Sequence, residues 1–536
     1  MTGLTGSARS TGLTGAWIAT RFTVRREAAR ISVWVIALSA LVVLTAASIP
    51  QVYPTQADLD AAAVASAHNA AAIAFNGPVQ GLDTLGGEVA FQAGTLGLIL
   101  VGLMSLLMIT RCTRAEEENG RTELLRAAAF GRHAQTASAL VVVTGMNLVI
   151  AGLVTVGLRA EHLPWAGSVA FGAGFLAVGL VLTALALVTV QLSQNARVAA
   201  GLAGGALGLA FALRAVGDIG DGRLSWLSPI GWAQKLRPYA GERWWPLAVP
   251  LVATVALLGL AHVLDARRDL GAGLVQPRPG PATASPRTGR PLGLVLHLER
   301  ASVVAWTAGV AVLAFVYGTI ADDIQSFVGD NQTLQRMMAA AGGVRLVDAY
   351  LGTSLLTLAL VGTGFAVASV QRMRTEETSL LAEPVLAAPV SRTRWAAAHL
   401  TVAFGGTVVV MTGAGLGVGI PYAVEEHDVH LVATVLGAAL VHLPAMWVLT
   451  GAAAALFGLL PRALSAAWLA LAGCFVVGFL GTVLRLPRWV GDLSPFQHTP
   501  QLPAAELGWT PLAVLAAVAV ALTVVGVASF GRRDLG

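Results

Sequence analysis

Residues 163–194 read LPWAGSVAFGAGFLAVGLVLTALALVTVQLSQ and contain no Asp, Glu, Lys or Arg. The stretch exceeds the roughly 20 apolar residues that a helix needs to cross a bilayer, and it is far longer than the roughly 9–11 residues of a membrane β-strand. A helix can cross lipid because it satisfies its own backbone hydrogen bonds. This segment therefore predicts a transmembrane α-helix and decides the fold class.

The same uncharged pattern recurs along the whole chain. Hydrophobic residues make up 56% of the 536 residues and charged residues 12%, whereas a soluble domain carries roughly 25% charged residues. The chain is therefore predicted to be an all-α polytopic membrane protein with about 12 transmembrane helices. The uncharged stretches are residues 31–57, 89–110, 134–158, 163–194, 198–213, 244–261, 301–321, 349–371, 395–424, 429–461, 463–484 and 507–531.

Arginine is distributed unevenly between the segments that connect these stretches. With the N-terminus placed inside, the inside segments hold 24 Arg, and the outside segments hold 9 Arg or Lys. Because cytoplasmic loops carry the excess of Arg and Lys, this bias predicts a bacterial plasma-membrane protein with both termini in the cytoplasm. The net charge of +5 then serves orientation and contact with membrane lipids, and we expect no nucleic-acid partner.

A segment rich in Pro and Gly divides the chain. Residues 271–291, GAGLVQPRPGPATASPRTGRP, are typical of a flexible connector because they cannot form a buried core. The arginine-bearing segment before the first span fits either a helix on the inner membrane surface or a simple positive flank. The predicted domains are a cytoplasmic N-terminal segment with a candidate interfacial helix (1–30), a first six-helix half (31–264), a cytoplasmic linker (265–300), a second six-helix half (301–530) and a cytoplasmic C-terminus (531–536).

Four landmarks recur in the same order in the two halves. RAEEENGRTELLRAAAFGR at residues 114–132 aligns without a gap with RTEETSLLAEPVLAAPVSR at residues 374–392. Because each half has an even number of predicted spans, the halves form two parallel six-helix repeats. The other three matches are Glu27 and Trp34 with Glu299 and Trp306, Leu-Ser-Pro at 227–229 with 493–495, and Arg-Arg-Asp-Leu-Gly at 267–271 with 532–536.

Each half has one large cytoplasmic loop, which carries Arg-x-Glu-Glu followed by a further Glu. Acidic residues contribute little to membrane orientation, so a repeated acidic cluster favours a docking surface for a cytoplasmic partner. The alternative is a solvated loop with local ion pairs. We expect these carboxylates to be available to the partner and dispensable for folding. The candidate residues are Arg114, Glu116, Glu117 and Glu123 in the first loop, and Arg374, Glu376, Glu377 and Glu383 in the second.

Enzyme and metal-site motifs are missing from the sequence. Lys235 is the only lysine, and it is not part of a G-x-x-x-x-G-K-[ST] phosphate-binding loop; HExxH, paired CxxC and GxSxG are missing too. We therefore expect no catalytic residue, cofactor site or metal site on this chain. His442 lies inside an uncharged stretch, where an ionisable residue is a candidate for a transport pathway. A neutral histidine bonded to a neighbouring helix is the simpler interpretation.

The two six-span halves, the repeated Arg-x-Glu-Glu loop and the outer Leu-Ser-Pro resemble the permease subunits of ABC-2-type exporters. They look most like the actinobacterial exporters of polyketide antibiotics, also called tetronasin-type permeases. This resemblance covers nearly the whole chain, except its first dozen residues and the linker. It implies that two copies of a cytoplasmic ATP-binding subunit, which hold ATP and Mg²⁺, dock on the two loops. The coupling residues would be Glu116, Glu117, Glu123, Glu376, Glu377 and Glu383.

The expected function is that of a permease subunit in an ATP-driven exporter of hydrophobic or amphipathic compounds such as antibiotics. Two other classes stay open. A proton-coupled drug transporter of the major-facilitator type needs ionisable groups inside the membrane, and only Asp348, Arg214 and a few histidines are candidates. A membrane-embedded lipid-modifying enzyme needs clustered carboxylates, and the outside acids at 425, 426 and 428 do not recur in the other half.

Overall fold

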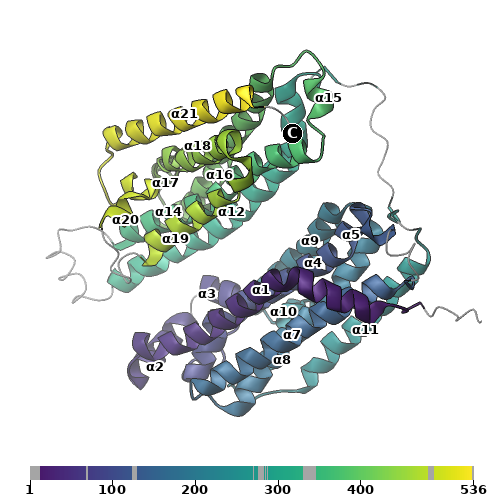
Figure 1. Cartoon of the computed structure of the whole chain (residues 1–536). Coiled ribbons are helices and arrows are strands. Elements are labelled where there is room, and N and C mark those ends of the chain that lie inside the picture. Colours follow the sequence, from purple (N-terminus) through teal and green to yellow (C-terminus); the bar gives the residue numbers. More distant parts are fainter. Residues whose placement is uncertain are drawn as a thin grey trace, which may run out of the picture. The chain divides into compact units, whose positions relative to one another are not determined.

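The structure is a computed structural model that describes residues 12–67, 70–123, 130–269, 271–275, 283, 285–286, 288–329, 346–480 and 488–533. Every regular element in these ranges is helical, which confirms the all-α fold class. The chain divides into two compact units, Met1–Pro279 and Gly280–Gly536. Figure 1 colours unit 1 from purple to teal and unit 2 from teal to yellow.

Unit 1 is a bundle of long apolar helices with short helices at their ends. The long helices are α1 (Ala16–Val52), α4 (Leu85–Cys112), α7 (Ala134–Ala160), α8 (Trp165–Leu192), α9 (Ala196–Ile219) and α11 (Ala248–Ala266). The short elements are α2 (Gln56–Ala67), α3 (Ala70–Asn76), α5 (Arg114–Glu118), η1 (Leu224–Leu227), α10 (Pro229–Gln234) and η2 (Trp245–Leu247).

Unit 2 repeats the order of the long helices in its described residues, except that two consecutive helices stand where unit 1 has the single helix α8. Its long elements are α12 (Pro291–Gly329), α14 (Leu346–Thr378), α16 (Arg392–Glu425), α17 (His430–Leu440), α18 (Leu443–Leu459), α19 (Ala466–Leu480) and α21 (Trp509–Arg532). Its short elements are α15 (Glu383–Leu386), η3 (Pro461–Ala463), α20 (Arg488–Asp492) and η4 (Pro495–His498).

Eleven segments of the described residues are long and apolar enough to cross a membrane. The segment His430–Leu459, which contains α17 and α18, counts as one of them. The twelfth predicted span, residues 463–484, corresponds to α19, whose described part has 15 residues. Residues 481–487 lie outside the described chain. The chain is therefore a polytopic membrane protein, and its described part contains eleven candidate spans and one shorter apolar helix.

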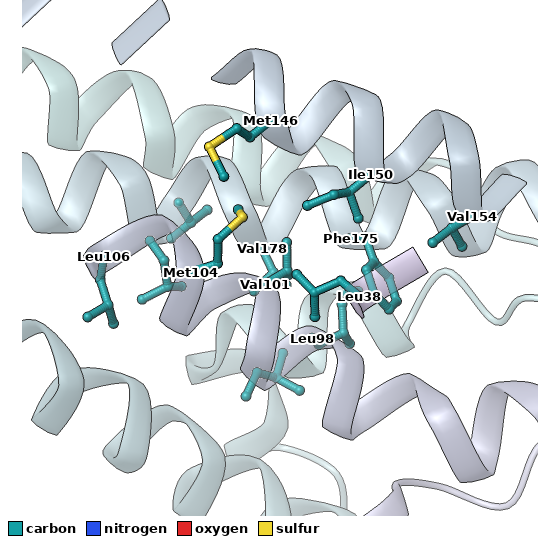
Figure 2. Packing of buried hydrophobic residues seen from close by; sticks show 14 of the residues in the cluster. Leu38, Leu98, Val101, Met104, Leu106, Met146, Ile150, Val154, Phe175 and Val178 are labelled. Carbon is teal, nitrogen blue, oxygen red and sulfur yellow. The ribbon is translucent and has the colours of Figure 1, made fainter. Parts of the chain in front are cut away.

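The two units share one packing scheme. In unit 1, α1 packs on α4 and α7, α4 packs on α8 and α9, and α8 packs on α11. In unit 2, α12 packs on α14 and α16, α14 packs on α18 and α19, and α18 packs on α21. Figure 2 shows how Leu38 of α1, Val101 of α4, Ile150 of α7 and Val178 of α8 meet in the core of unit 1. The repeated sequence landmarks therefore correspond to repeated packing.

Several helix limits follow from the sequence, and two differ from our expectation. Thr84 accepts a hydrogen bond from Gly87 N and caps α4, and Ser391 accepts one from Arg394 N and caps α16. The segment before the first predicted span is not a separate helix, because α1 is continuous from Ala16. Likewise α12 begins at Pro291, inside the predicted linker, where proline suits the start of a helix.

Candidate functional site

The first Arg-x-Glu-Glu loop begins where α4 ends. Thr113 departs from helical geometry, with φ −118° and ψ −83°, and the chain restarts as α5. This break directs the side chain of Arg114 into the protein, where Nε donates to Ser193 O at 2.6 Å and Nη2 donates to Ala272 O at 2.7 Å. Arg114 is only 1% exposed. It therefore ties the loop both to the end of α8 and to the segment that follows α11.

Glu117 receives the charge of two arginines. Both terminal nitrogens of Arg268 donate to its two carboxylate oxygens at 2.8 Å, and Arg114 Nη1 donates to the same carboxylate. Two-point arginine–carboxylate pairs are among the strongest hydrogen-bonded contacts in proteins. Burial acts to lower the pKa of Arg268, but the adjacent Glu117 raises this pKa above its ordinary value. The pair therefore stays ionised and holds the loop against the end of α11.

A second group of charges ties the same loop to α1. Arg26 Nη1 donates to Glu116 Oε2 at 2.7 Å, and Arg26 Nε donates to Glu27 Oε1 at 3.1 Å. The side chain of Glu27 is fully buried, and it also accepts hydrogen bonds from Arg30 and Arg111. A buried carboxylate needs such partners to stay charged. Arg26 thus joins α1 to the loop through one shared guanidinium.

The second unit builds the same first pair. Glu377 accepts from Arg374 Nη1 at 2.8 Å and also from Arg533 Nη2. Arg533 follows α21, as Arg268 follows α11, and the two arginines occupy equal places in the repeated Arg-Arg-Asp-Leu-Gly sequence. Arg533 also lies over the rings of Phe457 and Phe530, at 5.4 and 5.5 Å from their centroids. Two sequence landmarks that recur separately therefore meet in space in both units.

The second group in unit 2 uses different cations. Arg372 Nε lies 3.4 Å from Glu299 Oε1 and 3.1 Å from Glu376 Oε1, so an arginine of α14 joins the two carboxylates. In unit 1 the joining arginine comes from α1. His399 Nε2 also lies 3.3 Å from Glu376 Oε2, and the histidine is buried. The carboxylates therefore keep their places in the two units, while the arginine that joins them comes from a different helix.

These contacts correct part of the sequence prediction. The side chains of Glu116, Glu117, Glu376 and Glu377 are only 8–14% exposed. These four carboxylates are therefore less exposed than we expected, because each closes an ion pair inside its own unit. Glu123 and Glu383 do lie exposed on their loops. Residues 124–129 of the first loop lie outside the described chain.

Sequence reasoning missed the arginines that complete these networks. Arg268 and Arg533 belong to a repeated motif, and Glu27 and Glu299 to another, but no role was assigned to them. One sequence pattern could have revealed this pairing. Charged motifs from the start, middle and end of the first half all recur in the second half. Charges that recur together in an apolar chain are typical of groups that pair with one another.

His442 lies at the break between α17 and α18. It is fully buried, and its Nδ1 lies 3.1 Å from Thr499 Oγ1. Nε2 has no hydrogen-bond partner among the described residues. Pro444 stands in the first turn of α18, where its missing N–H interrupts the helix ladder. The position of His442 agrees with a histidine bonded to a neighbouring segment. A role of His442 in a transport pathway stays a prediction.

The end of unit 1 opposite to its loop carries the Leu-Ser-Pro landmark. Ser228 caps α10 by accepting from Gly231 N at 3.4 Å, with Pro229 in the first turn. Tyr239 follows, and its hydroxyl lies 2.9 Å from Ser168 Oγ. Burial raises the pKa of Tyr239 to about 12. In unit 2, Ser494 and Pro495 likewise begin a short helix, η4.

Two comparisons with known proteins bear on this arrangement. The family model for the C-terminal domain of the multidrug efflux system permease Rv1217c matches residues 289–531, which include nearly all of unit 2. The multidrug efflux system permease protein Rv1217c of Mycobacterium tuberculosis (strain ATCC 25618 / H37Rv) is 39% identical over 530 residues, covering 98% of this chain and 96% of the relative. With this similarity along both units, the chain belongs to the family of multidrug efflux system permeases.

Proposed function

We propose that this chain is the permease subunit of an ATP-driven exporter of the ABC-2 type, similar to the polyketide-antibiotic (tetronasin-type) exporters. The observation that carries the proposal is the set of ion pairs that connects each Arg-x-Glu-Glu loop to the helices of its own unit. Glu117 and Glu377 bind the arginine that follows the last helix of their unit, while Glu116 and Glu376 connect to the first helix. A force applied to either loop therefore reaches the first and last helices together.

In this proposal two copies of a cytoplasmic ATP-binding subunit, which hold ATP and Mg²⁺, dock on the two loops. The exposed Glu123 and Glu383 contact the partner, and the buried carboxylates transmit the movement into the helices. Both termini and the linker lie in the cytoplasm of a bacterial plasma membrane, as the arginine distribution predicts. The substrate is a hydrophobic or amphipathic compound, since the helices present few fixed charges.

Co-purification of the ATP-binding subunit tests the docking role. Charge reversal in the double variant Glu123→Arg, Glu383→Arg should leave the permease folded and weaken docking by roughly tenfold, because opposed charges at an interface become like charges. The matched control is Glu161→Arg, Glu425→Arg, which reverses two exposed acids at the opposite helix ends. The purified permease alone should hydrolyse no ATP. Equal docking by both double variants, or hydrolysis by the pure permease, would reject the proposal.

Cysteine labelling tests the orientation. In a background with Cys112→Ala and Cys474→Ala, single cysteines at residues 271–291 should react only from the cytoplasmic side. Single cysteines at residues 58–83 should react only from the outside. An impermeant maleimide applied to intact cells distinguishes the two sets. Labelling of the linker by this reagent would overturn the proposed orientation.

A further inference from the structure

The second Arg-x-Glu-Glu loop carries two neighbouring leucines with exposed side chains. Helix α14 ends at Thr378, and the leucines follow after one residue. Leu380 is 61% exposed and Leu381 is 64% exposed. Residues 378–391 contain one charged residue, Glu383. The tip of this loop is therefore an apolar surface, and exposed apolar side chains that lie together are typical of binding sites.

The backbone of Leu380 has a conformation that leucine rarely adopts. Its φ is +59°, in the left-handed region where a Cβ crowds the following carbonyl. Leu380 N donates to Glu377 O at 3.1 Å, and Leu381 N donates to Glu376 O at 2.9 Å. This pattern of hydrogen bonds ends many helices and usually places glycine at the left-handed position. A leucine there is strained, and strained residues gather at functional sites.

The first loop makes the same turn without a leucine. In the gap-free alignment of the two loops, Gly120 occupies the place of Leu380 and Arg121 that of Leu381. Gly120 has φ +70°, and its N–H donates to Glu117 O at 3.0 Å. The turn therefore forms with glycine and does not require a leucine. Packing inside unit 2 does not require the two leucines either, because their side chains are exposed.

The position of the tip favours a protein partner over lipid. The uncharged stretch that crosses the bilayer ends at residue 371, and α14 continues to Thr378, which adds about 10 Å along the helix axis. The headgroup layer is only about 5–8 Å thick on each side. An anionic inner leaflet would also repel Glu383. In the proposed orientation, the leucines thus lie beyond the lipid, where a cytoplasmic protein can contact them.

We propose that Leu380 and Leu381 form an apolar anchor that inserts into an apolar pocket of the cytoplasmic ATP-binding subunit. This inference rests on the function proposed above and adds the chemistry of the contact. The anchor is bonded through its backbone to residues 376 and 377, whose carboxylates connect to the first and last helices of unit 2. A movement of the anchor therefore reaches these ion pairs directly. The first loop docks without such an anchor.

Binding of the ATP-binding subunit that co-purifies with the parent, measured on permease variants in lipid nanodiscs, tests the anchor. The double variant Leu380→Ser, Leu381→Ser should bind roughly 30-fold more weakly, because two leucine side chains lose an apolar contact. Its unfolding in sodium dodecyl sulfate should match the parent, since both side chains are exposed in the free permease. Val429→Ser is the matched control, because Val429 is exposed at the opposite helix ends.

Equal binding by the double variant and the control would overturn the anchor and leave the exporter function in place. If no ATP-binding subunit co-purifies with the parent, the exporter function itself is rejected, and the anchor with it. The two failures are therefore distinguishable.

Leu380→Gly separates binding from backbone strain. Glycine adopts a positive φ without strain, so this variant should resist unfolding in sodium dodecyl sulfate at least as well as the parent. It should nevertheless bind the ATP-binding subunit roughly tenfold more weakly. A leucine with only a structural role would give the opposite result, a less stable permease with unchanged binding, and this result would overturn the proposal.

An environment-sensitive dye distinguishes a protein pocket from the membrane. Leu381→Cys, in a background with Cys112→Ala and Cys474→Ala, is labelled with acrylodan in nanodiscs that each hold one permease. The emission should be that of the dye in water until the ATP-binding subunit is added, and it should then shift to shorter wavelength. Short-wavelength emission before the addition would place the side chain in lipid. That result, or an unchanged emission after the subunit has bound, would overturn the proposal.

Discussion

Unit 1 and unit 2 contain the same ion pair in different surroundings. In unit 1, Arg114 and Arg268 are 1% and 6% exposed around Glu117, and both arginines also donate to Ala272 O in the segment that follows α11. In unit 2, Arg374 and Arg533 are 26% and 20% exposed around Glu377. The difference shows that equal sequence motifs do not make equal couplings, because burial decides how much a broken charge pair costs.

The units also differ in the helix that packs at their centre. α8 is continuous from Trp165 to Leu192, whereas its counterpart is divided between α17 and α18 at His442. The divided helix places a buried imidazole beside Thr499. In unit 1 a half-buried tyrosine, Tyr239, contacts the start of α8 instead. Each unit therefore has a polar contact of its own near the same end.

The largest expected difference between the units is in the loss of stability when the equivalent carboxylates Glu117 and Glu377 are neutralised. Glu117→Gln should lower the free energy of unfolding by about 3–5 kcal/mol, because it removes the carboxylate that two buried arginines share. Glu377→Gln should cost about 1–2 kcal/mol, since its arginines keep contact with water. Unfolding by sodium dodecyl sulfate, followed by circular dichroism, measures both values.

Two further variants sharpen this comparison. Glu123→Gln, an exposed acid on the same loop, should change stability by less than about 0.5 kcal/mol. The double variant Glu117→Gln, Arg268→Gln should recover part of the loss, because it removes one of the stranded charges. Equal costs for Glu117→Gln and Glu377→Gln would show that burial does not distinguish the two loops.

Tyr239 should give unit 1 a sensitivity to high pH. Its folded pKa of about 12 lies above the ordinary value near 10, so its stabilising effect is complete below pH 10 and is lost as pH rises from 10 towards 12. The parent should therefore lose about 2 kcal/mol over this range relative to Tyr239→Phe. At pH 8 the variant should be less stable by about 1 kcal/mol, through loss of the Ser168 hydrogen bond. Parallel stability curves for the two proteins between pH 9 and 11.5 would contradict this assignment.

The smallest effect is expected at His442 of unit 2. His442→Phe should cost about 1 kcal/mol and leave drug export at the parent level, because Thr499 still donates to Phe496 O. Thr499→Val should cost more, about 2 kcal/mol, since it leaves a buried imidazole without its partner. Export assays at matched expression, together with the unfolding titration, check both. Loss of export in a folded His442→Phe variant would make this histidine a pathway residue.

The sequence predicted the helices well, because a segment that crosses a bilayer must be apolar and this property can be seen from its composition alone. A run without charges such as residues 163–194 has few alternatives to a spanning helix. The burial of Glu117 could not be predicted in this way, because its partner Arg268 lies in a different segment and the contact depends on how α4 and α11 end. The continuity of α1 from Ala16 into the first span was also not predicted, since arginines continue a helix as readily as they flank one.

The joining arginine has a consequence for how duplicated proteins are compared. Glu27 and Glu116 share Arg26 of the first helix, whereas Glu299 and Glu376 share Arg372 of the second. A column-by-column alignment of the two halves scores both arginines as mismatches, although each joins the same two carboxylate positions. After a duplication, the residue that joins two charged positions can therefore come from a different helix in each half. Ancestral relationships between membrane halves are therefore better traced through conserved charge neighbourhoods than through conserved letters.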